Sequence, residues 1–195
     1  MYGDDELVEE RNAFEDGADS WTLYSDTPGS AGMDVEGLQK ALEDASRLWL
    51  AHDGLWFLEF EKRHGMEEAI EADKAAWAVF TKLEARRIMA RLGIEKGSGI
   101  AGLAEALCHR LYSNVNRQRV EVSADGARAR LTMESCWVQE TRIKKGLDHF
   151  PCKEVGLVEY GDFAMEIDPR IKLECRFCPP DETTEGAFCR WEFSL

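Results

Sequence analysis

The first half of the chain carries apolar residues at the spacing of an α-helix. Asp34 is suited to cap the first helix, because an apolar period of about 3.6 residues follows it along the chain. This pattern continues through an aromatic-rich stretch to Gly65, a typical glycine stop at a helix C-terminus. The same period predicts a helix over residues 66–92 and another over residues 99–116. We therefore expect the N-terminal half to be helical.

Strand patterns begin after these helices. Polar and apolar residues alternate on both sides of Ala124-Asp125-Gly126, which predicts a β-hairpin over residues 117–138. The remaining patterns are, in order, a short helix at 139–147, a longer helix at 150–169, and paired strands at 170–177 and 187–195. We therefore expect an α+β fold, in which the helical half packs on a small antiparallel sheet of β-β-α-β-β order.

Charge divides the chain into a tail and one domain. Residues 1–33 contain nine acidic residues and one basic residue, and they end in the breaker-rich stretch SDTPGSAG. Such a segment buries too little apolar surface to fold, so we expect a disordered acidic tail. The single domain is expected to span residues 34–195, with a helical part at 34–117 and a cysteine-rich, sheet-containing part at 118–195.

The acidic composition narrows the choice of partners. With a formal net charge of −14 and a pI near 4.8, the protein would repel phosphate backbones, so we expect no nucleic-acid partner. No run of about 18 apolar residues is present, and the acidic start lacks the pattern of a secretory signal. We therefore expect no membrane partner and a cytoplasmic location. Thiols stay reduced there, which favours metal ligation or thiol chemistry over disulfides.

The cysteines form the most specific pattern in the C-terminal half. From Cys136 onward their spacing is C-x15-C-x22-C-x2-C-x10-C. The C-x2-C pair lets two thiolates reach one ion, and a cysteine on the returning strand can approach the same point. In this metal site the thiolates of Cys175, Cys178 and Cys189 would be completed by Cys152, Cys136 or His149, and Cys152 is the first choice. Zinc is the expected metal, and an iron–sulfur cluster is the alternative.

Two other interpretations of the cysteines stay open. They can act as reactive or redox thiols, or they can pack in a hairpin as small apolar residues. A thioredoxin-like dithiol within the C-x2-C pair is disfavoured, because that chemistry places the pair at a helix N-terminus. Here a strand pattern precedes Cys175, and two prolines follow Cys178.

Acidic and aromatic residues of the helical half suggest a site for a small molecule. If the protein is an enzyme, Asp53 and His149 are the candidate proton-transfer groups beside the metal. Glu59, Asp73 and Glu84 are further carboxylates beside apolar helix stripes, where they would either act in acid–base chemistry or, more commonly, pair with an arginine. Aromatic residues dense enough to line a flat ligand's pocket, although more often part of a core, are Trp49, Trp56, Phe57, Phe60 and Trp77.

Several longer motifs carry a family resemblance: DGLWFLEFEKRHGMEEAIEADKAAW, LEARRIM, FPCKEVGL, IDPRIK, and CRFCPPD followed by CRWEF. Over residues 34–195 the chain resembles an uncharacterised family of cytosolic proteins from anaerobic bacteria and archaea. That family is distantly similar to L-2-amino-thiazoline-4-carboxylic acid hydrolase-like proteins, which implies ring opening of a small heterocyclic amidine. A looser likeness to vinyl-reductase-type domains implies a small-molecule-binding α+β module with cysteine ligands.

Two functional hypotheses follow from these observations. The first is a cytoplasmic, cysteine-ligated metal-binding protein that, as an enzyme, would hydrolyse a small C–N or C–S substrate. The second is a non-enzymatic module that senses a small molecule or a metal. In the second hypothesis the aromatic helical half forms either a ligand pocket or the face of a homodimer.

Overall fold

The computed structural model describes residues 27–182 and 186–195, so most of the predicted acidic tail lies outside the described residues. The N-terminal half consists of α1 (Val35–His64), α2 (Met66–Leu92), α3 (Gly99–Cys108) and the short 3-10 helix η1 (Leu111–Asn114). The C-terminal half consists of β1 (Gln118–Val122), β2 (Arg128–Met133), α4 (Trp137–Lys144), α5 (Lys153–Ile167), β3 (Lys172–Phe177) and β4 (Cys189–Ser194).

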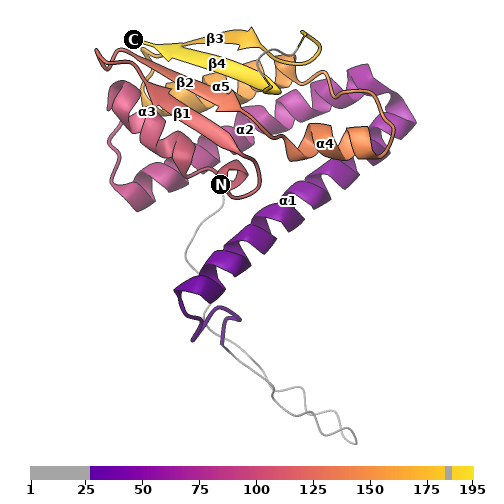
Figure 1. Cartoon of the computed structure of the whole chain (residues 1–195), viewed down its shortest axis with the longest axis horizontal. Coiled ribbons are helices and arrows are strands. Elements are labelled where there is room, and N and C mark those ends of the chain that lie inside the picture. The colour runs from indigo at the N-terminus through magenta and orange to yellow at the C-terminus, as the bar shows by residue number, and fades with distance from the viewer. Residues whose placement is uncertain (1–26, 183–185) are drawn as a thin grey trace, which may run out of the picture.

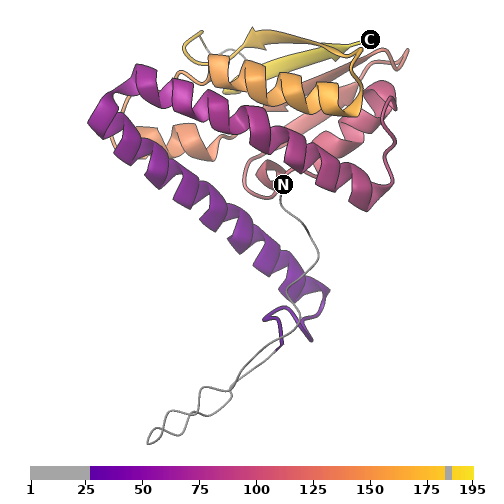
Figure 2. The same ribbon diagram turned by 180° about the vertical axis from the view of Figure 1, so that it is seen from behind.

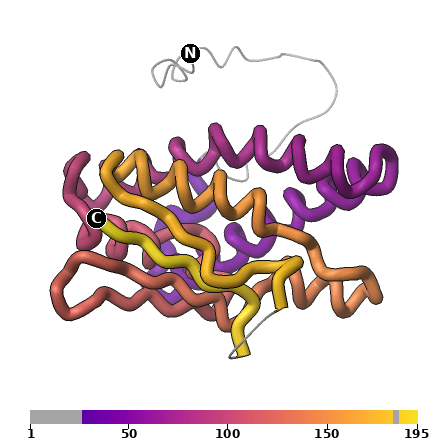
Figure 3. The backbone as a smooth tube through the Cα atoms, turned by 90° about the horizontal axis from the view of Figure 1, so that it is seen from above, coloured from indigo at the N-terminus to yellow at the C-terminus, as the bar shows by residue number. Residues whose placement is uncertain are grey.

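The four strands form one antiparallel sheet in the order β1-β2-β4-β3. In the register of the central strands, Leu131 of β2 lies opposite Val120 of β1 and Trp191 of β4. Figure 1 shows the sheet on one side of the molecule with the helices behind it, and Figure 3 shows α5 between the sheet and α2. The expected α+β class, with a helical N-terminal half and an antiparallel sheet in the C-terminal half, is confirmed.

The two faces of the sheet differ in polarity. Trp191 and Phe193 of β4 are fully buried in the main core together with Phe163 of α5. Figure 2, seen from the helical side, shows α5 lying along this covered face. Charged residues occupy the other face, where Arg130 and Glu192 form a cross-strand ion pair at 2.8 Å. Side chains alternate along each strand, so an antiparallel sheet can bury one face and expose the other.

Local signals explain where the two long helices begin and end. The carboxylate of Asp34 accepts a hydrogen bond from the N–H of Gly37 at 2.8 Å, so Asp34 caps α1 as predicted. Gly65 has a φ of +90°, a backbone conformation that favours glycine, and it separates α1 from α2. α1 is 30 residues long, and its N-terminal half extends away from the sheet in Figure 1. Even so, no helix in the described ranges is apolar enough over a sufficient length to cross a bilayer.

The helix predicted over residues 99–116 is wrong in its C-terminal part. α3 ends at Cys108 because the next residues bond to α2 instead of continuing the helix. The N–H of Leu111 donates to the carboxylate of Glu84 at 3.2 Å, and Arg110 forms an ion pair with the same carboxylate at 2.8 Å. These contacts replace the backbone bonds that a longer α3 would need. The other predicted elements are present, with ends shifted by a few residues.

Candidate functional site

A cavity of about 350 Å³ lies between α1, α2, α4 and α5, next to the end of the sheet where β2 stops and β4 begins. Met133 and Cys189, which pair across β2 and β4, both line it. Its volume falls within the range of roughly 300–1,000 Å³ that is typical of small-molecule pockets. The side chains that these four helices direct toward one another leave part of the space between them unfilled.

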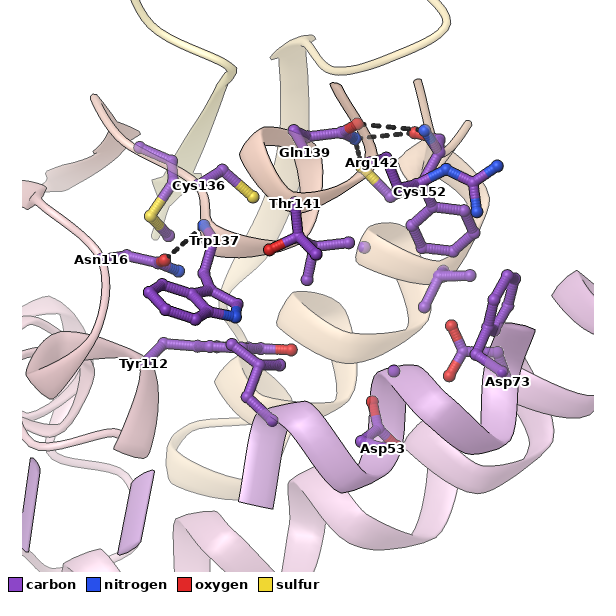
Figure 4. A pocket seen from close by; sticks show the side chains of 18 of the residues that line it. Asp53, Asp73, Tyr112, Asn116, Cys136, Trp137, Gln139, Thr141, Arg142 and Cys152 are labelled. Carbon is purple, nitrogen blue, oxygen red and sulfur yellow. Dashed lines mark hydrogen bonds between the residues drawn. The ribbon is translucent and has the colours of Figure 1, made fainter. Parts of the chain in front are cut away.

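Aromatic rings from several helices and from the segment before α5 line the cavity. Phe57 of α1 packs against Phe150, which precedes α5, with ring centroids 4.8 Å apart. Trp77 of α2 stacks on Tyr112 of η1, with ring centroids 5.9 Å apart. Figure 4 shows Tyr112 beside Trp137 of α4 in the same pocket. The wall therefore offers several flat, rigid surfaces to a ligand.

The predicted aromatic pocket residues divide into three groups. Phe57 and Trp77 line the cavity, in agreement with a pocket role. Trp49 does not line it and stacks on Phe80 at 5.3 Å in the adjoining apolar cluster. Trp56 and Phe60 are exposed on α1, away from both.

Two carboxyl groups face the cavity from neighbouring helices. Asp53 of α1 and Asp73 of α2 both line it, and Figure 4 shows their carboxyl groups on the same side of the pocket. Burial raises the pKa of Asp73 to about 7; the charges of Asp53 and Glu159 add to this rise, while a hydrogen bond with Trp77 opposes it. Burial also raises the pKa of Asp53, against the opposing effect of His52. In the described part of the chain no Lys or Arg side chain compensates either carboxyl group.

A third carboxylate, Glu159 of α5, is already paired. Arg110 is buried and bridges Glu84 at 2.8 Å and Glu159 at 2.7 Å. Its guanidinium carbon lies 4.8 Å from the ring centroid of Phe163 and 5.4 Å from that of Tyr112. Burial raises the pKa of Glu159 to about 7 even though Arg110 lowers it. This ion network links α2, α5 and the segment after α3, and Glu159 is its member that lines the cavity.

Four of the five predicted cysteine ligands line the cavity: Cys136, Cys152, Cys178 and Cys189. The Sγ atoms of Cys152 and Cys178 are 3.4 Å apart. Cys152 lies at the N-cap position of α5, and the Gln139 side-chain amide donates to its Sγ at 3.4 Å, as Figure 4 shows. The hydrogen bond from Cys178 lowers the pKa of Cys152, whereas hydrogen bonds with Cys152 and Cys189 raise the pKa of Cys178. Burial raises the pKa of Cys136 to about 12.

The remaining predicted site residues lie elsewhere. Cys175 on β3 is half-buried against the main core and does not line the cavity, and burial raises the pKa of its thiol to about 11. His149 is exposed, with its ring 6.5 Å from that of Phe188, and it does not line the cavity either. The structure therefore brings Asp53 together with four cysteines and leaves His149 and Cys175 outside.

The predicted metal centre does not appear as a ready-made cluster. Within residues 27–182 and 186–195, no group of three or more His, Cys, Asp or Glu side chains is arranged to hold a metal ion. The cysteine-bound zinc ion and the iron–sulfur cluster therefore stay predictions from the sequence.

Three residues of the site had no clear signal in the sequence. Gln139 of α4 and Glu159 of α5 are polar residues, yet both are buried and line the cavity. Tyr112 follows the unexpected end of α3. A buried polar residue is recognisable only once the packing of its helix is known, because the same residue type is usually exposed on a helix surface.

Comparisons with curated proteins and with solved structures find no match to this chain. One protein family does match, described as a family of unknown function (DUF6125), and the match covers residues 32–195. It gives no support for a source in anaerobes or for similarity to thiazoline-carboxylate hydrolase-like proteins. The matched range begins just before α1 and includes every element of the fold and every residue of the cavity. The chain belongs to the DUF6125 family.

Proposed function

We propose that the protein binds a small organic molecule in this cavity, and that the ligand combines an apolar or aromatic body with a basic nitrogen. The main support is the position of Asp53 and Asp73 in an aromatic wall, with no Lys or Arg partner among the described residues. A protonated amine beside these two carboxyl groups would supply the missing counter-charge.

Electrostatics favour a cation at this position. The ionised form of Asp73 is disfavoured by burial and by the charge of Asp53, which is why its pKa is raised to about 7. A positive charge within about 4–6 Å would oppose both effects and favour the ionised carboxylate. Nearby aromatic rings such as Trp77 can add a cation–π attraction of about 0.5–2 kcal/mol.

The apolar wall accounts for the rest of the ligand. Removing apolar surface from water contributes about 25 cal/mol per Å², so an aromatic or aliphatic body gains affinity throughout the cavity. A volume of about 350 Å³ is sufficient for a molecule of one or two rings and too small for a peptide segment. The carboxyl groups would then select among such molecules by charge.

An anionic ligand is the main alternative, because Arg142 and Lys145 also line the cavity. The guanidinium of Arg142, however, is already bound to the carboxylate of Glu61 by two hydrogen bonds of 2.8 and 3.1 Å. Lys145 is exposed just beyond α4, so solvent and salt weaken the effect of its charge. The two Asp residues are therefore the stronger determinants of ligand charge.

Titration calorimetry with three indole compounds tests the choice of charge. Tryptamine is cationic, tryptophol is its neutral analogue, and indole-3-propionate is its anionic analogue. At pH 8 we expect tryptamine to bind tightest, and Asp73→Asn to weaken tryptamine by about tenfold, which corresponds to about 1.4 kcal/mol, while leaving tryptophol nearly unchanged. Tryptamine affinity in the wild type should rise from pH 6 to pH 8 as Asp73 loses its proton.

Asp44→Asn is the matched control, because Asp44 is an exposed residue of α1 that does not line the cavity. It removes the same formal charge and should leave all three affinities unchanged. Equal binding of tryptamine and tryptophol, or tightest binding of indole-3-propionate, would refute the proposed ligand class.

The other functional predictions from the sequence are compatible with this pocket but need their own tests. A heterocyclic amidine is itself a basic molecule, so hydrolysis of a small C–N or C–S substrate, with Asp53 as a proton-transfer group, would use the same cavity. Elemental analysis of protein purified without oxygen, compared with Cys178→Ser, tests for zinc or an iron–sulfur cluster. Sedimentation analysis tests for the predicted homodimer, and localisation of the tagged protein tests for a cytoplasmic site.

A further inference from the structure

We propose that Cys152 and Cys178 form a reversible dithiol–disulfide pair that exchanges, through the cavity, with a low-molecular-weight organic disulfide. The two cysteines are 26 positions apart in the chain, yet their Sγ atoms are 3.4 Å apart. A disulfide bond is about 2.0 Å long, so a side-chain movement of roughly 1.4 Å would close it. This pair differs from the C-x2-C motif, which joins Cys178 to Cys175. Cys175 does not line the cavity.

A set of specific contacts holds the two sulfurs together. The loop after β3 docks on the first turn of α5, where the N–H of Lys153 donates to the carbonyl of Pro179 at 3.0 Å. The ammonium group of Lys153 also binds the carboxylate of Asp181 at 2.8 Å. That carboxylate in turn accepts the N–H of Cys178 at 3.3 Å. One backbone hydrogen bond and one ion pair therefore join the two segments that carry these thiols.

Cys152 is the better nucleophile of the two. It lies at the N-terminus of a 15-residue helix, whose dipole favours negative charge on its sulfur. The side-chain amide of Gln139 donates to the same sulfur at 3.4 Å. Gln139 is buried and is held in place by two bonds of 2.8 and 3.0 Å to the backbone of Phe150, so its donor is fixed toward Cys152.

Access to the pair is through the cavity, because Cys178 is only 1% exposed and both cysteines line the pocket wall. In the first step the Cys152 thiolate attacks one sulfur of the organic disulfide RSSR. A mixed disulfide forms on Cys152, and the departing RS⁻ takes up the proton that Cys152 has released. In the second step Cys178 loses its proton and attacks the Cys152 sulfur, which releases a second RSH. Two protein thiols are oxidised, and one RSSR is reduced to two RSH.

Cys189 is the competing partner, because it also forms a hydrogen bond with Cys178. It is the first residue of β4, where it pairs with Met133 of β2, and it does not lie at a helix N-terminus. Only Cys152 combines contact with Cys178, a helix N-terminus and a fixed amide donor. We therefore expect the bond to join Cys152 to Cys178 and leave Cys189 as a free thiol.

Disulfide mapping after equilibration with a small neutral disulfide, bis(2-hydroxyethyl) disulfide, tests this assignment on the full-length wild-type protein. The protein is incubated in mixtures of this disulfide and its thiol, 2-mercaptoethanol, free thiols are blocked with N-ethylmaleimide, and peptides are identified by mass spectrometry. We expect a Cys152–Cys178 linked peptide that increases with the disulfide fraction and disappears on return to 2-mercaptoethanol alone. A Cys178–Cys189 or Cys175–Cys178 link in its place, or no link at all, would overturn the proposal.

Single variants separate the two steps. Cys178→Ser should stop at the first step and accumulate 2-mercaptoethanol on Cys152 as a mixed disulfide, whereas Cys152→Ser should give no adduct on Cys178. Cys175→Ser, the other half of the C-x2-C motif, should form the Cys152–Cys178 link as the wild type does. Absence of a 2-mercaptoethanol adduct on Cys152 in a folded Cys178→Ser protein, judged by its circular dichroism, would contradict the mechanism. None of these readouts depends on the amine ligand, so each proposal can fail alone.

Discussion

The indole of Trp191 on β4 lies directly against the backbone of Gly156 on α5. A Cβ atom at position 156 would be 2.5 Å from Cζ2 and 2.8 Å from Cη2 of that ring. Both residues line the cavity, and Trp191 is completely buried. The absence of a side chain at Gly156 therefore sets how closely α5 approaches the sheet and where the ring forms part of the pocket wall.

Replacing Gly156 with Ala should destabilise the protein. The new methyl group must displace Trp191 or α5, and overpacking of this kind costs about 1–3 kcal/mol. Gly161→Ala on the same helix is the matched control, because its Cβ would lie 3.7 Å from Leu173, an ordinary contact. The control should gain about 0.5–1 kcal/mol from helix propensity. Urea denaturation of both variants measures the difference; equal stabilisation of both would show that the Trp191 contact is not tight.

Arg110→Met should be among the most destabilising single substitutions. It leaves the buried carboxylates of Glu84 and Glu159 without their shared partner, and removing one member of a buried ion pair costs about 3–5 kcal/mol. Arg86→Met is the control, because its ion pair with Glu166 is largely exposed on the Arg86 side and should contribute at most about 1 kcal/mol. Thermal unfolding of both variants and the wild type measures the two losses of stability. A loss for Arg110→Met no larger than for Arg86→Met would contradict a structural role of the network.

Asp73 should make the protein less stable as pH rises. Its pKa is raised to about 7 in the folded state, above that of an unfolded Asp, so the folded state binds more protons between about pH 4 and pH 7. The free energy of unfolding should therefore fall across this window. Asp73→Asn lacks this effect, so its stability relative to wild type should improve from pH 4 to pH 8 by about 1–2 kcal/mol, allowing for partial exposure.

The measurement is urea denaturation of wild type and variant at matched pH values. The variant-minus-wild-type difference is needed because Glu159, also raised to about 7, titrates in both proteins. A difference that stays constant from pH 4 to pH 8 would show that Asp73 is not held in a site that disfavours its charge.

Arg142 should control how firmly α4 closes one side of the cavity. Its guanidinium binds the carboxylate of Glu61 on α1 and the carbonyl of Asp148 at 2.7 Å. Arg142→Met should speed amide hydrogen exchange in α4 with little effect on the sheet, because the lost bonds join α4 to α1 and to Asp148 and do not involve the sheet. Lys144→Met, an exposed change on the same helix, serves as the control. Unchanged exchange in α4 would show that other contacts hold this helix.

Most of the secondary structure was predictable because it depends on residues that are close in the chain. The period of apolar residues predicted α1 and α2, and Asp34 and Gly65 marked their ends. Alternation around Gly126 predicted the first hairpin. α3 was predicted too long because the partner that ends it, Glu84, lies on another helix. No local pattern contains that information.

The sequence by itself determined the α+β class, the long helices and the two hairpins, since side-chain spacing and helix caps act over a few residues. Tertiary structure decided which chemical groups meet. Packing placed Cys178 beside Cys152. It left Cys175, which is only three positions before Cys178 in the chain, outside the cavity. It also placed Asp53 and Asp73 on one wall of an aromatic pocket. Such contacts depend on how whole elements pack over long sequence separations, and residue spacing within one element does not contain that geometry.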